Sequence, residues 1–184
     1  MKLRAILSIL FAVPFAVAAQ PQPAGIVTLV PGQAVTIHIA DDTGGAVTLE
    51  GRGAAALSDF DRAAIRRFSD PKYNAAASGP TGIAVDDSEQ GLPAATPVTP
   101  GAVHIMFAEV ADGAQTMLIL ENGYDRGLVY RVRIQERCTM HVTDVCLVIP
   151  MRRGYENWPF ASGRIELSDF RLERWDPSQG IQCR

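Results

Sequence analysis

The sequence predicts an all-β, mainly antiparallel fold, arranged as a β-sandwich or as a barrel-like sheet. Short apolar runs that alternate with polar residues recur along the chain, and turn-forming pairs such as Pro31-Gly32 and Asp112-Gly113 separate them. One segment has the spacing of an amphipathic helix, and strands do not alternate with helices as they do in parallel sheets. Many short strands with tight turns between them are typical of antiparallel sandwiches and barrels.

The chain begins with the pattern of a secretory signal peptide over residues 1–19. Lys2 and Arg4 give a positive start, an apolar run covers residues 5–17, and small residues at 16–19 offer a cleavage site. The run is shorter than the roughly 20 residues that a membrane span needs. We therefore expect cleavage, no transmembrane anchor afterwards, and a periplasmic or secreted location.

After cleavage we expect residues 20–25 to form a flexible leader and residues 26–184 to form a single β-rich domain. Loss of Lys2 and Arg4 lowers the basic residues from 17 to 15, while all 20 acidic residues remain, so the net charge becomes −5. This acidic balance disfavours nucleic acid as a partner. Lys72 is then the only lysine beside many arginines, which is typical of a GC-rich bacterial genome.

Three strands are predicted in the N-terminal part of the domain. The first covers residues 26–30, and the second covers residues 35–39, in which apolar and polar residues alternate. The third covers residues 46–50 and follows a loop rich in aspartate and glycine. The alternation in the second strand predicts one buried face and one exposed face, with His38 on the exposed face.

A short amphipathic helix is predicted over residues 58–68. Ser58 and Asp61 have the spacing of a capping box, and the apolar residues that follow fall on one face. A long loop, rich in small residues and proline, follows over residues 74–101. Because loops of this length are unusual in compact domains, we expect it either to add a short strand at residues 82–85 or to be a functional or mobile element.

The clearest prediction is an antiparallel meander in the middle of the chain. Residues 103–107 alternate, Asp112-Gly113 is a strong hairpin signal, and residues 117–120 run back. Alternation resumes over residues 129–134 after a second turn. We expect these three strands to pair in order, with one face of the sheet turned to solvent.

Two strands and a loop are predicted in the C-terminal part. Residues 142–149 form a strand that ends at Pro150, and residues 152–163 form a loop. Residues 165–172 form the last strand, in which the apolar positions change parity partway along. This change predicts a β-bulge near Ser168-Asp169.

The chain has three cysteines, Cys138, Cys146 and Cys183. In an oxidising compartment we expect one disulfide and one remaining thiol. We favour Cys146 with Cys183, because this bond would tie the C-terminal segment to a central strand. Cys138 with Cys146, as a cross-strand bond, is the alternative.

The cysteines also allow a second interpretation, a metal-stabilised module. Cys138 and His141 have C-x-x-H spacing, and together with Cys146 and Cys183 they supply the four ligands of a tetrahedral zinc site. Because the oxidising compartment of an exported protein disfavours free thiolates, we expect the disulfide and no cofactor. Acidic residues at 86–89 are a candidate for calcium, although they lack the EF-hand spacing.

Tyr155, Trp158 and Phe160 form the candidate binding surface, because aromatic side chains next to arginines often contact sugars or peptides. The sequence contains no G-x-S-x-G nucleophile elbow. We therefore expect an exported, non-enzymatic module that binds an envelope protein or glycan. The alternatives are a small exported hydrolase built around the loop at residues 76–101, and a zinc- or calcium-stabilised module.

Overall fold

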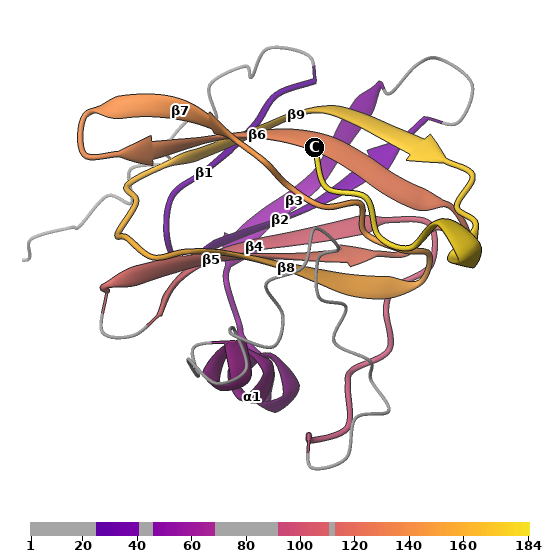
Figure 1. The fold of residues 1–184 in the computed structure, drawn as a ribbon, viewed down its shortest axis with the longest axis horizontal. Coiled ribbons are helices and arrows are strands. Elements are labelled where there is room, and N and C mark those ends of the chain that lie inside the picture. Colours follow the sequence, from indigo (N-terminus) through magenta and orange to yellow (C-terminus); the bar gives the residue numbers. More distant parts are fainter. Residues whose placement is uncertain (1–24, 41–45, 69–91, 111–112) are drawn as a thin grey trace, which may run out of the picture.

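The computed structural model describes residues 25–40, 46–68, 92–110 and 113–184. In this part of the chain, two antiparallel sheets face each other and a short helix lies outside them (Figure 1). The predicted all-β fold is confirmed, and the arrangement is a sandwich rather than a closed barrel. Among the described residues, no helix is long and apolar enough to cross a membrane.

The first sheet has four strands, which lie on one side of the sandwich (Figure 1). Their order is β1 (Val27–Leu29), β9 (Ile165–Glu173), β6 (Gly127–Glu136) and β7 (Thr139–Thr143).

The second sheet has five strands and carries the helix on its outer face (Figure 1). Their order is β3 (Val47–Ala54), β2 (Gln33–Ile39), β4 (Val103–Val110), β5 (Gln115–Asn122) and β8 (Arg152–Trp158). A single turn of 3-10 helix, η1 (Pro177–Gln179), follows the last strand.

The helix α1 (Asp59–Phe68) lies where the sequence predicts it. Asp61 N–H donates to Ser58 Oγ at 3.1 Å, and Ser58 N–H donates to Asp61 Oδ2 at 3.0 Å, which together complete the predicted capping box. Arg66 and Arg67 lie in the last turn, where positive charge is favourable to the helix dipole.

Two apolar clusters hold these layers together. Apolar side chains from the inner faces of both sheets form the inter-sheet core, which includes Leu29, Ile37, Ile105, Leu128 and Phe170. A second cluster packs α1 against the outer face of the five-stranded sheet, and it includes Ala34, Phe60, Ile65, Met106 and Ile119. Part of the outer face of β4 and β5 is therefore covered by α1, although we expected this face to be turned to solvent.

The predicted meander is correct for its first two strands and wrong for the third. β4 pairs with β5, but β6 pairs with β7 and β9 in the other sheet. Asn122 helps to explain the crossing, because its buried side-chain amide donates to the carbonyls of Arg126 and Val148. These bonds stabilise an arch between the sheets in place of a tight hairpin.

Two C-terminal predictions are also wrong. The predicted strand at residues 142–149 ends at Thr143, and beyond it only isolated bridges occur. The predicted loop at residues 152–163 contains β8, the edge strand next to β5. Its inward positions include Gly154 and Glu156, so the strand lacks the apolar alternation that would have revealed it.

The predicted β-bulge in the last strand is confirmed. The register between β6 and β9 shifts between Val129 and Arg131, and Asp169 adopts a positive φ of 54°. Several other predictions lie outside the described residues: the signal peptide, most of the leader, the strand at 82–85 and the acidic cluster at 86–89.

Candidate functional site

A row of polar side chains crosses the outer face of the five-stranded sheet. Thr36 on β2 is the register partner of His104 on β4, His104 is the partner of Glu121 on β5, and Glu121 is the partner of Arg153 on β8. Directly opposed residues in antiparallel strands have Cβ atoms about 5 Å apart on the same face. The four side chains therefore form one continuous polar row, next to the apolar cluster beneath α1.

Polar contacts join the members of this row in two pairs, Thr36 with His104 and Glu121 with Arg153. Thr36 Oγ1 and His104 Nδ1 are 3.1 Å apart. The guanidinium of Arg153 donates from Nε to Glu121 Oε1 at 2.8 Å, and Nη2 lies 2.8 Å from the same oxygen. Both contacts go to the same carboxylate oxygen.

Arg153 is the buried anchor of the row. Its side chain is 2% exposed, and its guanidinium also donates to the carbonyl of Thr96, lies 3.8 Å from Asp61 Oδ1 and stacks over the Phe60 ring at 5.7 Å. One cation thus joins α1, β5, β8 and the segment before β4. A buried charge is tolerated only when it is paired in this way.

Asp61 closes the network under the helix. Its Oδ1 accepts a hydrogen bond from the Tyr155 hydroxyl at 2.9 Å, while its Oδ2 accepts from Ser58. Burial, reinforced by the charge of Asp61, raises the pKa of Tyr155 well above its usual range. Tyr155 therefore stays a hydrogen-bond donor at all physiological pH values.

A cavity of about 360 Å³ opens beside this row. Thr36, His104 and Glu121 form its floor, Glu50 on β3 lies at one side, and residues 96–102 form the opposite wall. Its volume falls in the range of small-molecule sites in proteins, roughly 300–1,000 Å³.

Gly123 fixes the wall of this cavity. Gly123 N–H donates to Ala102 O at 2.8 Å, and Gly101 N–H donates to Gly123 O at 2.7 Å. A Cβ at Gly123 would lie 1.9 Å from the carbonyl oxygen of Thr99, so only glycine allows this close approach. The wall is therefore attached directly to the strand that carries Glu121.

His38 lies at the rim, exposed as the sequence predicts. Its Nδ1 is 2.9 Å from Gly101 O, and its Nε2 is 3.2 Å from Glu50 Oε2. The rim residues His38 and Glu50 thus connect β2 and β3 to the wall of the cavity.

The predicted aromatic surface does not form. Trp158 lies in the inter-sheet core and donates its indole N–H to Thr143 Oγ1 at 3.0 Å, and Phe160 packs against the same core. Tyr155 lies on the other face of β8, beneath α1. The structure therefore divides the three side chains between two clusters, because Tyr155 and Trp158 lie on opposite faces of β8 and Phe160 follows the strand.

The cysteines take the pairing that the sequence analysis favoured. Cys146 and Cys183 form a disulfide, and Cys138 is free and exposed between β6 and β7. Two of the four proposed zinc ligands are therefore used in this bond. Across the part of the chain that the structure describes, no group of three or more His, Cys, Asp or Glu side chains is arranged to hold a metal.

Sequence reasoning missed the polar row. Alternation alone places Thr36 and His104 on outward faces, but it does not reveal which strands are neighbours. Arg153 and Glu121 meet only because residues 152–158 form a strand, and that strand was expected to be a loop. Comparison with protein families, with curated proteins and with solved structures finds no match for this chain.

Proposed function

We propose that the protein is an exported, non-enzymatic binding module of a bacterial envelope, and that it holds a small polar ligand in the cavity above Thr36, His104 and Glu121. A sugar unit of an envelope glycan is the ligand class that we favour. The observation that carries this proposal is the buried Arg153, which fixes Glu121 at the cavity floor and the Thr96 carbonyl at its wall.

The chemistry of the floor supports a ligand rich in hydroxyl groups. A hydroxyl, an imidazole and a carboxylate side by side offer both donors and acceptors, which hydroxyl groups can satisfy in pairs. The carboxylate of Glu121 is held by two contacts before any ligand arrives. Binding then costs little ordering of side chains, because the recognition groups are already in place.

The test uses the full mature chain and two sugar probes, glucose and N-acetylglucosamine, with binding followed by saturation-transfer NMR and calorimetry. We compare wild type with His104→Ala, which removes the centre of the floor, and with His141→Ala, an exposed histidine on β7 in the other sheet. We expect at least one probe to bind wild type and His141→Ala and to lose about tenfold or more in affinity with His104→Ala. Binding by neither probe, or equal binding by all three proteins, would refute the proposal.

The contact between Thr36 Oγ1 and His104 Nδ1 favours a second candidate, an exported hydrolase. A hydroxyl within hydrogen-bond distance of an imidazole is the pair that activates a nucleophile for acyl transfer, and Glu121 is the register partner of His104 on the next strand. Incubation with p-nitrophenyl acetate distinguishes the two proposals. Loss of ester cleavage in Thr36→Val, with wild-type cleavage in His141→Ala, would support the hydrolase. Equal rates in wild type and both variants would eliminate it.

A further inference from the structure

The last three residues, 182–184, form a C-terminal strap that pairs antiparallel with residues 145–147 outside the regular sheets. Val145 N–H donates to Arg184 O at 3.0 Å, Arg184 N–H donates to Val145 O at 2.9 Å, and Leu147 N–H donates to Gln182 O at 2.9 Å. Figure 1 shows the chain end, marked C, beside the four-stranded sheet. The Cys146–Cys183 disulfide lies at the centre of this short ladder.

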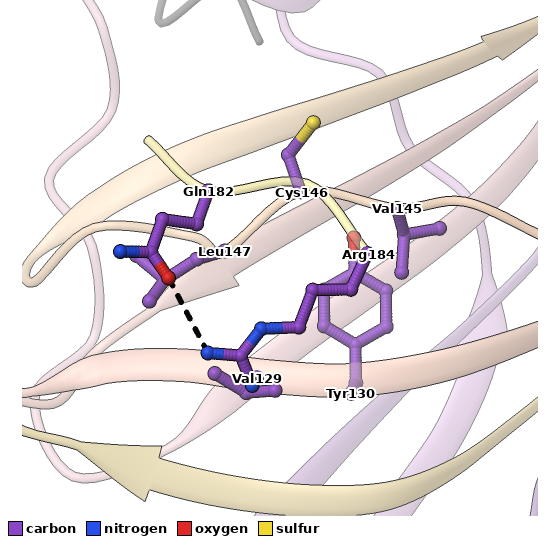
Figure 2. Close-up of a pocket in the computed structure, with 7 residues that line it drawn as sticks. All are labelled: Val129, Tyr130, Val145, Cys146, Leu147, Gln182 and Arg184. Carbon is purple, nitrogen blue, oxygen red and sulfur yellow. Dashed lines mark hydrogen bonds between the residues drawn. The ribbon is translucent and has the colours of Figure 1, made fainter. Parts of the chain in front are cut away.

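The disulfide is open to solvent on its Cys183 side. All three strap residues are exposed, Cys146 is half-buried, and none of these residues belongs to either apolar cluster. Figure 2 shows that Gln182 and Arg184 roof a small gap above Val129 and Tyr130, with a hydrogen bond between the two roof side chains. Because the strap adds no side chain to the core, breaking the disulfide should release the strap without unfolding the sandwich.

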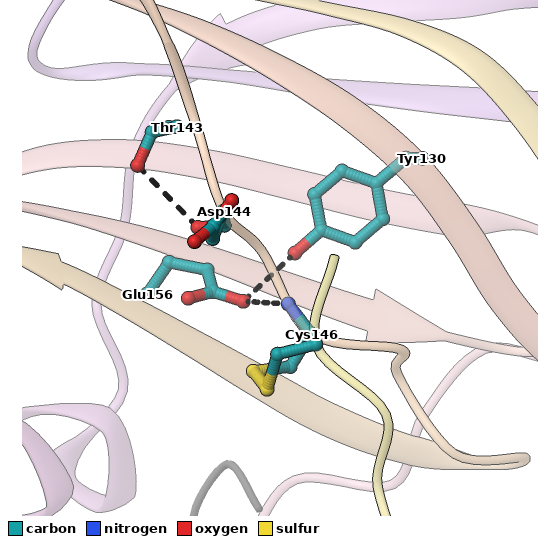
Figure 3. The surroundings of a disulfide bond; sticks show 6 residues. Tyr130, Thr143, Asp144, Cys146 and Glu156 are labelled. Carbon is teal, nitrogen blue, oxygen red and sulfur yellow. Dashed lines mark hydrogen bonds between the residues drawn. A yellow bond between two sulfur atoms is a disulfide. The ribbon is translucent and has the colours of Figure 1, made fainter. Parts of the chain in front are cut away.

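A half-buried acid lies next to the strap. Glu156, on the inner face of β8, accepts the Cys146 N–H at 2.7 Å and the Tyr130 hydroxyl at 3.3 Å (Figure 3). Five other charged groups line the neighbouring gap and groove: Asp144 on the disulfide-bearing segment, Arg184 on the strap, Arg131 on β6, and Asp169 and Arg171 on β9.

We propose that Cys146–Cys183 is a reversible dithiol/disulfide couple, which an external dithiol reduces by attack at the exposed Cys183, and that Glu156 tunes this couple through Cys146. This inference goes beyond ligand binding and does not depend on the polar cavity, which lies on the other face of the five-stranded sheet.

The chemistry balances with one external dithiol. A thiolate of the dithiol attacks Cys183 Sγ, the S–S bond breaks, and Cys146 leaves as a thiolate. The second thiol of the dithiol then displaces Cys183 from the mixed disulfide. The external dithiol is oxidised to a disulfide, and its two electrons and two protons end on Cys146 and Cys183.

Glu156 affects this step through its charge. Burial raises the pKa of Glu156 from its ordinary value of 4.5 to about 7, so the carboxyl is neutral in mild acid and ionised above neutrality. An ionised carboxylate next to the Cys146 backbone disfavours a thiolate on the same residue, because like charges repel strongly in a buried site. We expect the wild-type rate constant, expressed per attacking thiolate, to fall about tenfold as the pH rises through 7.

The test follows reduction by dithiothreitol in the full mature chain with Cys138→Ser, so that only the disulfide releases thiols. Alkylation and mass spectrometry count the thiols, near-ultraviolet circular dichroism reports the packing of the sandwich, and a glutathione redox buffer tests reversibility. Glu156→Gln keeps the acceptor for Cys146 N–H but removes the charge, and Glu109→Gln, an exposed position on β4, is the matched control.

We expect two thiols to appear reversibly while the near-ultraviolet signal persists. We also expect the pH dependence of the rate constant to disappear in Glu156→Gln and to remain in Glu109→Gln. Thiols that appear only together with loss of the near-ultraviolet signal would overturn the couple. Identical pH profiles in wild type and Glu156→Gln would overturn the role of Glu156. Tyr130→Phe removes the second hydrogen bond to the same carboxyl, so we expect it to shift the pH profile of the rate constant by less than Glu156→Gln changes it.

Discussion

Arg153 and Glu121 form a buried ion pair in which two guanidinium nitrogens, Nε and Nη2, each lie 2.8 Å from the same carboxylate oxygen. The Arg153 side chain is 2% exposed and the Glu121 side chain 15% exposed. Asp61 adds a second carboxylate 3.8 Å from the guanidinium. Removing the cation would therefore leave two acidic groups with little water to replace it.

We expect Arg153→Met to lower the free energy of unfolding by about 3–5 kcal/mol, the cost of breaking a buried pair from one side. Arg131→Met is the matched control, because Arg131 is 77% exposed and pairs with the exposed Asp169 at 3.3 Å. Such surface pairs contribute roughly 0–1 kcal/mol. Urea denaturation of both variants measures the difference, and equal losses would contradict the anchoring role of Arg153.

Gly123 gives a prediction about the cavity wall. In Gly123→Ala the new methyl group would meet the carbonyl oxygens of Thr99 at 1.9 Å and Ala102 at 2.6 Å, which are backbone atoms that cannot rotate away. We expect a loss of about 3 kcal/mol or more, together with displacement of residues 96–102. Gly51→Ala is the control, since a Cβ there meets nothing within 4 Å. Thermal unfolding and amide chemical shifts of the wall residues would check both effects.

Ser58 tests the helix that packs beside the polar row. Ser58→Ala removes the acceptor for Asp61 N–H, and the loss of such a cap costs about 1 kcal/mol. Ser58→Thr keeps the hydroxyl and should cost only a few tenths of a kcal/mol. Urea denaturation that gives the two variants the same stability would show that the capping box does not stabilise α1.

Local signals account for what the sequence predicted correctly. The capping box at Ser58 and the parity change near Asp169 depend on residues a few positions apart, and both features occur where they were expected. The pairing of β4 with β5 follows from alternation on each side of a turn.

Long-range features account for what the sequence did not predict. β6 leaves β5 for the other sheet because Asn122 stabilises an arch through carbonyls distant in the sequence, among them Val148. β8 was missed because Arg153 is buried by pairing with charges from other elements, which no hydropathy pattern records. The polar row depends on both features, so its position could not be derived from the chain alone.

Glu156 makes a prediction about stability and pH. Its pKa is raised from 4.5 to about 7 in the folded protein, mainly by burial, so the folded state binds more protons than the unfolded state between these two values. The contribution of Glu156 to stability is therefore fully present below about pH 4.5 and is lost as the pH rises to about 7. A shift of this size corresponds to about 3 kcal/mol.

Glu156→Gln should remove this dependence, because the amide oxygen still accepts from Cys146 N–H but carries no charge at any pH. We expect the free energy of unfolding of the variant, minus that of wild type, to increase by about 3 kcal/mol as the pH rises from about 4.5 to a mildly alkaline value. Urea denaturation across this interval measures the change, with Glu109→Gln as the exposed control that should follow wild type. If the free energies of unfolding of Glu156→Gln and wild type differ by the same amount at every pH, the pKa of Glu156 is the same in the folded and unfolded protein, and the prediction is wrong.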